Sequence, residues 1–476
     1  MIFFFPFFSL IFRLVPIRRC FGGKGTCTMT ITLAWWAALI GLALAIVLIL
    51  MKLNPTYSLL LGTVIGCLIG GAGFTGTVTI VVQGGQSVMG TIIRVLAAGV
   101  LAGVMMESGA ATQIARTIVS KFGEKLAIFS LAFATMIICA VGVFIPVAVL
   151  IVAPIAIEVG SRLGISKLAL LIALSGGGKA GNIISPNPNT IAAASGFSSK
   201  SVTIQPSQVM VGSLLPALCG LIMAVFLATL MKKRGTIVQM SDLQEKTGKG
   251  GTSQAGSSQS SDSAEKLPSI GTSLVAPIVA VVLLLINPVG SLLHISLLEK
   301  FQVDAMYILP FAALVGMVAM GQAKHVLAYT KAGLGRMVDV VLILIGAGAI
   351  GALITNSNLP QQIVWLINHM GVPGTLLAPI AGILMAAATA STSTGVILGS
   401  QAFGGSILSF GTSRLAAAIT MQAGATVIDG LPQGNYFHVT GNAMNMDLKE
   451  RMSVVPFEAL VGLTMTIVAT LMYIVF

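Results

Sequence analysis

The residues with the clearest capacity for chemistry lie in a short segment, 175–190, that interrupts an otherwise apolar stretch of chain. Its 16 positions hold four glycines, two prolines and three asparagines, a combination that disfavours a continuous helix. A lysine in such a break can pair with a carboxylate, and neighbouring amides and hydroxyls can hydrogen-bond to hydroxyl groups. We therefore predict that a small organic anion is bound here by Lys179, Asn182, Ser185, Asn187, Asn189 and Thr190.

Three further interruptions have related compositions: Gly424–Asn435 before the last apolar run, and Thr389–Gly395 and Gly142–Pro146 upstream. Unwound backbone at membrane depth must lie inside protein or beside a watery cavity, because lipid cannot hydrogen-bond to it. A half-helix that starts there presents unpaired N–H groups and a partial positive charge, which favour a carboxylate. The predicted substrate-binding residues of the second half are Ser391, Thr392, Ser393, Thr394, Gln433 and Asn435. Ordinary loops outside the membrane are the alternative interpretation.

Ionisable residues inside apolar segments are costly and are therefore candidates for function. Lys179 could bind the substrate carboxylate, or its long side chain could reach the membrane surface or a backbone carbonyl. Asp429 could take part in cation coupling or proton transfer, or pair with Lys179 in the empty site. We assign Asp429, Glu107 and His438 to ion coupling, although Glu107 could equally be a helix-end residue at the membrane interface. Two other acids that begin or enter apolar segments are interpreted as interface residues: Asp339 and Glu458.

The composition places this chemistry in a membrane protein. Only 8% of the 476 residues are charged and the mean hydropathy is +0.98, whereas soluble domains carry about 25% charged residues. Several apolar stretches are long enough to cross about 30 Å of hydrocarbon as a helix: Leu33–Met51, Val209–Met231, Leu274–Leu293 and Val454–Phe476. The net charge of +12 does not indicate nucleic-acid binding, because the basic residues cluster beside apolar segments, as in cytoplasm-facing loops.

Two segments fall outside the membrane pattern. Residues 1–28 could be an extra membrane segment, a signal-like segment or upstream codons added by a misplaced start; we favour the last, with Met29 as a second plausible start. Their positive residues follow the apolar run, which is the wrong order for a signal peptide. Residues 232–269 are rich in Gly, Ser, Gln and Thr and are predicted to be a flexible linker. This linker divides the chain into two membrane repeats, 29–231 and 270–476.

The two halves match weakly in sequence. Gln113-Ile114 corresponds to Gln362-Ile363, and Pro186 and Asn189 correspond to Pro432 and Asn435 at nearly the same spacing. Many secondary transporters are built from such repeats, with the substrate site where the halves meet. Chance similarity between apolar, low-complexity segments is the alternative.

From Lys52 to the C-terminus, outside the linker, the chain resembles the gluconate permease (GntP) family of the ion transporter superfamily. The resemblance depends on five segments: Met106-Glu107-Ser108-Gly109, Arg162–Ser166, the prolines Pro186 and Pro188, Asp429–Asn435 and Asp447–Glu450. Two segments depart from the family pattern, which has a Pro-Pro-His-Pro-Gly-Pro type sequence in place of Ser185–Thr190 and an aromatic-aromatic-acidic stretch in place of Phe144–Val149. The resemblance implies two inverted halves with hairpins that enter the membrane, and import of sugar acids and related hydroxy or amino acids with a coupling cation.

Together these observations predict an all-α integral membrane protein with roughly 11 to 14 membrane segments, counting half-helices and hairpins, in two inverted repeats of the elevator type. The expected function is H⁺- or Na⁺-coupled uptake of a small organic anion, sugar acids such as gluconate first, across the inner membrane. We expect no metal site and no other cofactor, and the resemblance implies a homodimer. The alternatives are a cation–proton antiporter and an intramembrane enzyme, although HExxH, GxSxG, P-loop and CxxC motifs are absent.

Overall fold

The fold was analysed in a computed structural model, which describes residues 33–199, 202–239, 242, 267–293, 295, 303–370, 373–432 and 434–475. Every regular element within these ranges is a helix, so the predicted all-α class is confirmed for the described chain. The interpretations of residues 1–28 fall outside these ranges.

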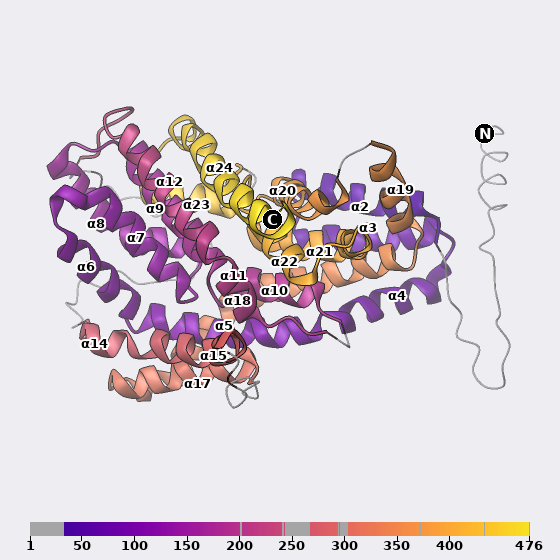
Figure 1. The fold of residues 1–476 in the computed structure, drawn as a ribbon, viewed down its shortest axis with the longest axis horizontal. Coiled ribbons are helices and arrows are strands. Elements are labelled where there is room, and N and C mark those ends of the chain that lie inside the picture. The colour runs from indigo at the N-terminus through magenta and orange to yellow at the C-terminus, as the bar shows by residue number, and fades with distance from the viewer. Residues whose placement is uncertain are drawn as a thin grey trace.

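The first part of the chain folds into helices that pack side by side (Figure 1). Their bounds are α2 (Trp35–Leu50), α3 (Pro55–Ile69), α4 (Gly73–Ser87), α5 (Met89–Glu107), α6 (Ala110–Phe122), η1 (Glu124–Leu126), α7 (Ala127–Ala140), α8 (Ile145–Leu163), α9 (Lys167–Ile183), α10 (Pro188–Phe197), α11 (Pro206–Gly212) and α12 (Leu214–Leu230).

The second part contains α14 (Ile270–Ser273), α15 (Val275–Leu293), α17 (Ala305–Ala319), η3 (Ala323–His325), α18 (Val326–Thr355), α19 (Leu359–Met370), η4 (Gly374–Leu376), α20 (Leu377–Thr389), α21 (Thr392–Ser409), α22 (Arg414–Ala425), α23 (Asn435–Ala443), α24 (Leu448–Thr470) and the π-helical turn η5 (Leu471–Val475).

The order and packing of the helices recur between these parts. The series α6, α7, α8, α9, α10 and α12 has a counterpart in α19, α20, α21, α22, α23 and α24. In the first series α7 packs against α9, and in the second α20 packs against α22. The contacts between the series are reciprocal as well, because α10 packs against α21 while α23 packs against α8.

Two groups of helices can be distinguished by their packing. We call α2–α5, α15, α17 and α18 the frame helices, because α18 packs along α3, α4 and α5, and α17 packs on α5 and α15. We call α7–α10, α12 and α20–α24 the site helices; among them α24 lies against α9, α12 and α22. The groups meet where α10 contacts α5 and where α21 contacts α18.

The described helices can cross a membrane several times. By length and composition five are long and apolar enough to span it, or up to seven when two bent pairs count as one span each. The bent pairs are α6 with η1–α7, at 109°, and α11 with α12, at 49°, and five shorter apolar helices of 10–17 residues accompany them. Large apolar side chains point outward, among them Phe74 at 83% exposure and Ile222 at 67%, as a surface solvated by lipid requires.

The glycine-rich run Ser175–Asn182 was predicted to interrupt the helix, and this was wrong: α9 continues through it to Ile183. The glycines permit close helix packing instead. A Cβ at Gly177 would lie 2.0 Å from the Ala132 carbonyl oxygen of α7, and one at Gly181 would lie 2.1 Å from the Met136 oxygen. Small residues at crossings let helix backbones approach this closely. The actual break is short, Ile184–Asn187.

The other breaks are also shorter than predicted. Thr392–Gly395 form the first turn of α21, so the chain is non-helical only at Ala390 and Ser391. Gly424 and Ala425 end α22, and the second broken segment runs from Thr426 to Gly434. Because glycine and threonine close to a helix end can remain helical when packing favours it, composition alone overestimated the unwound length.

The start of the predicted flexible linker is packed against the N-terminal end of α9. The Ser166 N–H donates to Lys232 O at 2.9 Å, the Lys167 N–H donates to Thr236 O at 2.8 Å, and Val238 is 2% exposed. Residues 240, 241 and 243–266 of that prediction lie outside the described chain.

The crossing of α7 and α9 generates the first prediction. Gly177→Ala should destabilise the protein by about 1–3 kcal/mol, because the added methyl overlaps a backbone carbonyl that cannot rotate away. Gly405→Ala is the matched control: Gly405 is exposed in α21, and a Cβ added there would have nothing within 4 Å, so the change should be neutral or stabilise by about 0.5–1 kcal/mol. Thermal unfolding of detergent-purified protein measures both, and equal effects would contradict the packing argument.

A second prediction concerns the ion pair that joins α5 to the start of α17. Arg94 donates two hydrogen bonds at 3.0 Å and one at 2.7 Å to the Asp304 carboxylate. Burial alone would raise the pKa of Asp304. The hydrogen bonds from Arg94 and the Met306 N–H, together with the Arg94 charge, have the larger combined effect and hold this pKa below its usual value.

Because the folded-state pKa is the lower one, this pair stabilises the fold fully above the unfolded pKa, about 3.9. The contribution is lost as the pH falls through the folded value. Asp304→Asn should therefore lower the unfolding temperature at pH 7, and the difference from wild type should shrink as the pH falls below about 4. A difference that is constant with pH would show that the carboxylate charge is not involved.

Candidate functional site

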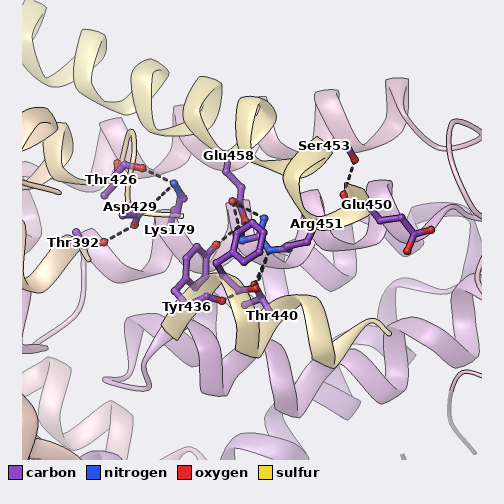
Figure 2. Close-up of polar contacts among 11 residues, drawn as sticks. Lys179, Thr392, Thr426, Asp429, Tyr436, Thr440, Glu450, Arg451, Ser453 and Glu458 are labelled. Carbon is purple, nitrogen blue, oxygen red and sulfur yellow. Dashed lines mark hydrogen bonds and ion pairs between the residues drawn. The ribbon is translucent and has the colours of Figure 1, made fainter. Parts of the chain in front are cut away.

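A buried ion pair joins the two broken helices. Lys179, on α9, donates from Nζ to Asp429 Oδ1 at 2.6 Å and to the Thr426 carbonyl oxygen at 2.5 Å. The side chains of Lys179 and Asp429 are 0% and 3% exposed. Asp429 and Thr426 belong to the second break, so the pair connects the first half of the chain with the second (Figure 2).

A third element completes this cluster. Thr392, the first residue of α21, donates from Oγ1 to Asp429 Oδ2 at 2.5 Å. One carboxylate oxygen therefore faces the ammonium group and the other faces a hydroxyl. Desolvation of two charges is expensive, and it is tolerated when the charges are paired and the remaining lone pairs are hydrogen-bonded, as they are here.

The first break is organised by Asn187, the N-cap of α10. Its Oδ1 accepts from the backbone N–H of Asn189 at 3.0 Å and of Thr190 at 3.1 Å. Its Nδ2 donates to Asn182 O at 2.8 Å and to Asn182 Oδ1 at 2.5 Å. Pro188 occupies the first helical position, which needs no N–H donor. Asn187 and Asn182 thus shape the break, while the side chain of Asn189 is directed elsewhere.

Asn189 makes contact across the two halves. Its Oδ1 accepts a short hydrogen bond from Ser393 Oγ, in the first turn of α21. The start of α10 and the start of α21 therefore meet, each with its own side-chain cap: Asn187 for α10, and Ser391, which accepts from the Thr394 N–H at 3.3 Å, for α21.

Gln422 of α22 is a site residue that sequence reasoning missed. Its Nε2 donates to Ile183 O at 2.8 Å and to Thr190 Oγ1 at 3.2 Å, so it binds the last turn of α9 and the start of α10. Its Oε1, like Ser185 Oγ in the first break, is buried with no partner among the described residues. Gln422 is a polar residue in the apolar second half of α22, where Thr420 is its only other polar neighbour, and that was the available signal.

Three predicted site residues lie apart from this cluster. Glu107 ends α5 and pairs with Arg336 at 2.7 Å among the frame helices. His438 is exposed on α23, its Nε2 2.7 Å from Pro432 O. Asn435 is exposed at the first position of α23, and Gln433 is outside the described residues. Asp339 is exposed on α18, and its predicted interface position stays a prediction.

The interpretation of Glu458 as an interface residue was wrong. Glu458 and Arg451, both on α24, are 1% exposed and form an ion pair at 3.1 Å. Tyr436 on α23 donates to Glu458 Oε1 at 2.8 Å. Figure 2 shows this second charged cluster beside the first. Two opposite charges seven positions apart lie on the same face of a helix but two turns apart, so their spacing alone does not indicate a pair. The sequence also does not show that other helices cover both.

With this geometry described, comparison with known proteins is informative. The family model described as GntP family permease matches residues 31–476. The chain belongs to the GntP permease family. An uncharacterised transporter of Haemophilus influenzae is 43% identical over 439 residues, which cover 92% of this chain and 98% of that protein. The D-serine transporter DsdX of Escherichia coli is 23% identical over 376 residues, or 75% of this chain and 80% of DsdX.

Solved structures share the fold of this GntP family member. The YdaH transporter of Alcanivorax borkumensis matches with a TM-score of 0.58 and 16% identity, over 91% of this chain and 96% of YdaH. MtrF of Neisseria gonorrhoeae also matches with a TM-score of 0.58, at 15% identity, over 90% of this chain and 95% of MtrF. The family membership, together with the apolar helices, identifies a multi-pass membrane transporter and not an enzyme.

The Lys179–Asp429 pair generates the third prediction. Lys179→Met should destabilise this GntP permease by about 3–5 kcal/mol, because it leaves a buried carboxylate without its counter-charge. The double variant Lys179→Met/Asp429→Leu should recover most of that loss, since an apolar pair of similar volume removes both desolvation costs. Thermal unfolding in detergent measures this, and additive losses would mean that the two charges do not depend on each other.

Proposed function

We propose that this GntP family transporter takes up a small carboxylate that also carries hydroxyl or amino groups, sugar acids such as gluconate first, and couples its uptake to H⁺ or Na⁺. The observation that carries the proposal is the Lys179–Asp429 pair, held between two broken helices and the start of α21. A lysine whose partner is an acid of the same protein can exchange that partner for a carboxylate of the substrate.

Charge balance explains why a cation should accompany the anion. When a substrate carboxylate takes the place of the Asp429 carboxylate at Lys179, the Asp429 charge loses its partner in a buried place. An unpaired buried charge is strongly unfavourable. A proton or Na⁺ at Asp429 restores neutrality, so substrate and cation are favoured together. A zwitterionic amino acid could restore neutrality without a coupled cation, by placing its own ammonium group at Asp429.

The polar contacts around the pair suit the rest of such a substrate. Asn189 and Ser393 hydrogen-bond to each other across the halves. Thr190 follows Asn189 on α10 and accepts a hydrogen bond from Gln422 of α22. These groups can exchange their mutual bonds for bonds to hydroxyl or amino groups. DsdX, the relative that is named as a D-serine transporter, would carry a substrate of this kind, with a carboxylate, a hydroxyl and an amino group.

We further propose that the two helix series are inverted repeats and that the site helices move relative to the frame helices to expose the site to each side in turn. The reciprocal packing of α10 on α21 and α23 on α8 supports the repeat, and the separate packing of the two groups supports the motion. A homodimer in the inner membrane belongs to the same proposal and can be tested by native mass spectrometry.

The fourth prediction is uptake by the purified protein in proteoliposomes. Gluconate, D-serine and dicarboxylates are offered under an imposed pH or Na⁺ gradient, and at least one carboxylate should accumulate. Asn189→Ala should abolish uptake without loss of expression, because it removes the acceptor of Ser393. Asn442→Ala is the matched control: Asn442 is exposed near the end of α23, so uptake should be unchanged.

The outcomes separate the alternatives. Cation movement with no effect of any organic anion would support a cation–proton antiporter. Full uptake by Asn189→Ala would remove the proposed site.

A further inference from the structure

The second charged cluster consists of Arg451 and Glu458 on α24 and Tyr436 on α23. The guanidinium group donates three bonds of 3.1 Å to Glu458, and its Nε donates to Phe437 O at 3.2 Å and Thr440 Oγ1 at 3.1 Å. Its Cζ lies 4.8 Å from the centroid of the Phe437 ring and 5.5 Å from that of Tyr436. The charged groups are therefore fully engaged with α23 and with each other.

Stability alone does not explain this cluster. Replacement of a buried ion pair by apolar residues of similar volume is often neutral or stabilising, because desolvation offsets most of the attraction. Ionisable groups inside a membrane protein are hypotheses of function for the same reason. Because the donors of Arg451 are used on protein acceptors, the cluster is built to hold parts of the protein in place rather than to bind a ligand.

The part that it holds is the second break. A Cβ at Gly430 would lie 2.6 Å from Glu458 Oε2 and 3.6 Å from Arg451 Nη2. The backbone at Gly430, next to Asp429, therefore packs directly against the ion pair. One turn further along α24, a Cβ at Gly462 would lie 2.4 Å from the Thr426 oxygen. The segment from Thr426 to Gly430 therefore lies directly along α24.

This segment supplies both groups that face Lys179: the Thr426 carbonyl oxygen and the Asp429 carboxylate. We propose that Arg451, Glu458 and Tyr436 are positioning residues, which fix the second break against α24 and so set the place of Asp429 relative to Lys179. The consequence for transport rests on the proposed function; the positioning itself does not.

Hydrogen exchange of residues 426–432, followed by mass spectrometry in detergent, tests the positioning without a substrate. Arg451→Met/Glu458→Leu keeps the volume and removes both charges, so the protein should stay folded while exchange in this segment rises about tenfold. The matched control Arg94→Met/Asp304→Leu removes an ion pair of the frame helices and should leave the segment unchanged. Unchanged exchange in a folded Arg451/Glu458 variant would overturn the proposal.

Single variants that keep both charges cover the case in which that double variant does not fold. Gly430→Ala places a methyl against Glu458 and should raise exchange in the same segment. Tyr436→Phe removes one hydrogen bond to Glu458 and should also raise exchange there, whereas Gly405→Ala, whose methyl would have nothing within 4 Å, should leave the segment unchanged. Unchanged exchange in both Gly430→Ala and Tyr436→Phe would overturn the proposal.

Transport kinetics then show whether the positioning matters for the substrate. With any carboxylate that the wild type accumulates, Arg451→Met/Glu458→Leu should raise KM about tenfold and change the maximal rate by less than about twofold. This is the pattern of a lost binding interaction that is equally strong in the ground state and the transition state. Tyr436→Phe, which loses one hydrogen bond, should lie between the double variant and wild type. If the wild type accumulates none of the panel, the proposed function fails while the exchange result still decides the positioning.

Discussion

The ion pair between Lys179 and Asp429 is the constraint on which the rest of the site depends. A buried ammonium group and a buried carboxylate persist in an apolar interior only together. They come from segments on either side of the predicted linker, so the two parts of the chain must fold onto each other for either charge to be tolerated. The last turns of α9, the second break and the start of α21 all contribute groups that form this pair or bond to it. The second break is in turn packed along α24.

The helices recur between the two parts, but their chemistry does not. The break between α20 and α21 carries Ser391 and leads into three hydroxyl residues, whereas the corresponding break between α7 and α8, Val141–Phe144, is apolar. The polar groups therefore gather where α10 meets α21, whereas α23, which packs on α8, is held by hydrogen bonds to the cluster on α24.

Residue types predicted the places of the breaks, because prolines, asparagines and charges are conspicuous in an apolar sequence. The pairing of Lys179 with Asp429 was one of the alternatives for two charges in matching breaks, although the structure places Lys179 within α9 and only Asp429 in a break. Composition failed for Ser175–Asn182, because the glycines there are required by close packing against carbonyl groups of another helix and do not break α9. It also failed for Gln422, because its partners lie on α9 and α10, far away in the sequence. For Arg451 and Glu458 it failed because the sequence does not show that α23 packs over this pair on α24.

The crossing of α7 and α9 has a mechanical consequence. Packed helices slip past each other by fractions of a turn when their interlocking side chains change rotamer. Where Gly177 and Gly181 meet carbonyl oxygens there is no side chain to readjust. We therefore expect α7 and α9 to move as one rigid unit, so that a displacement of α9 at Lys179 would also move the turn at Val141–Phe144.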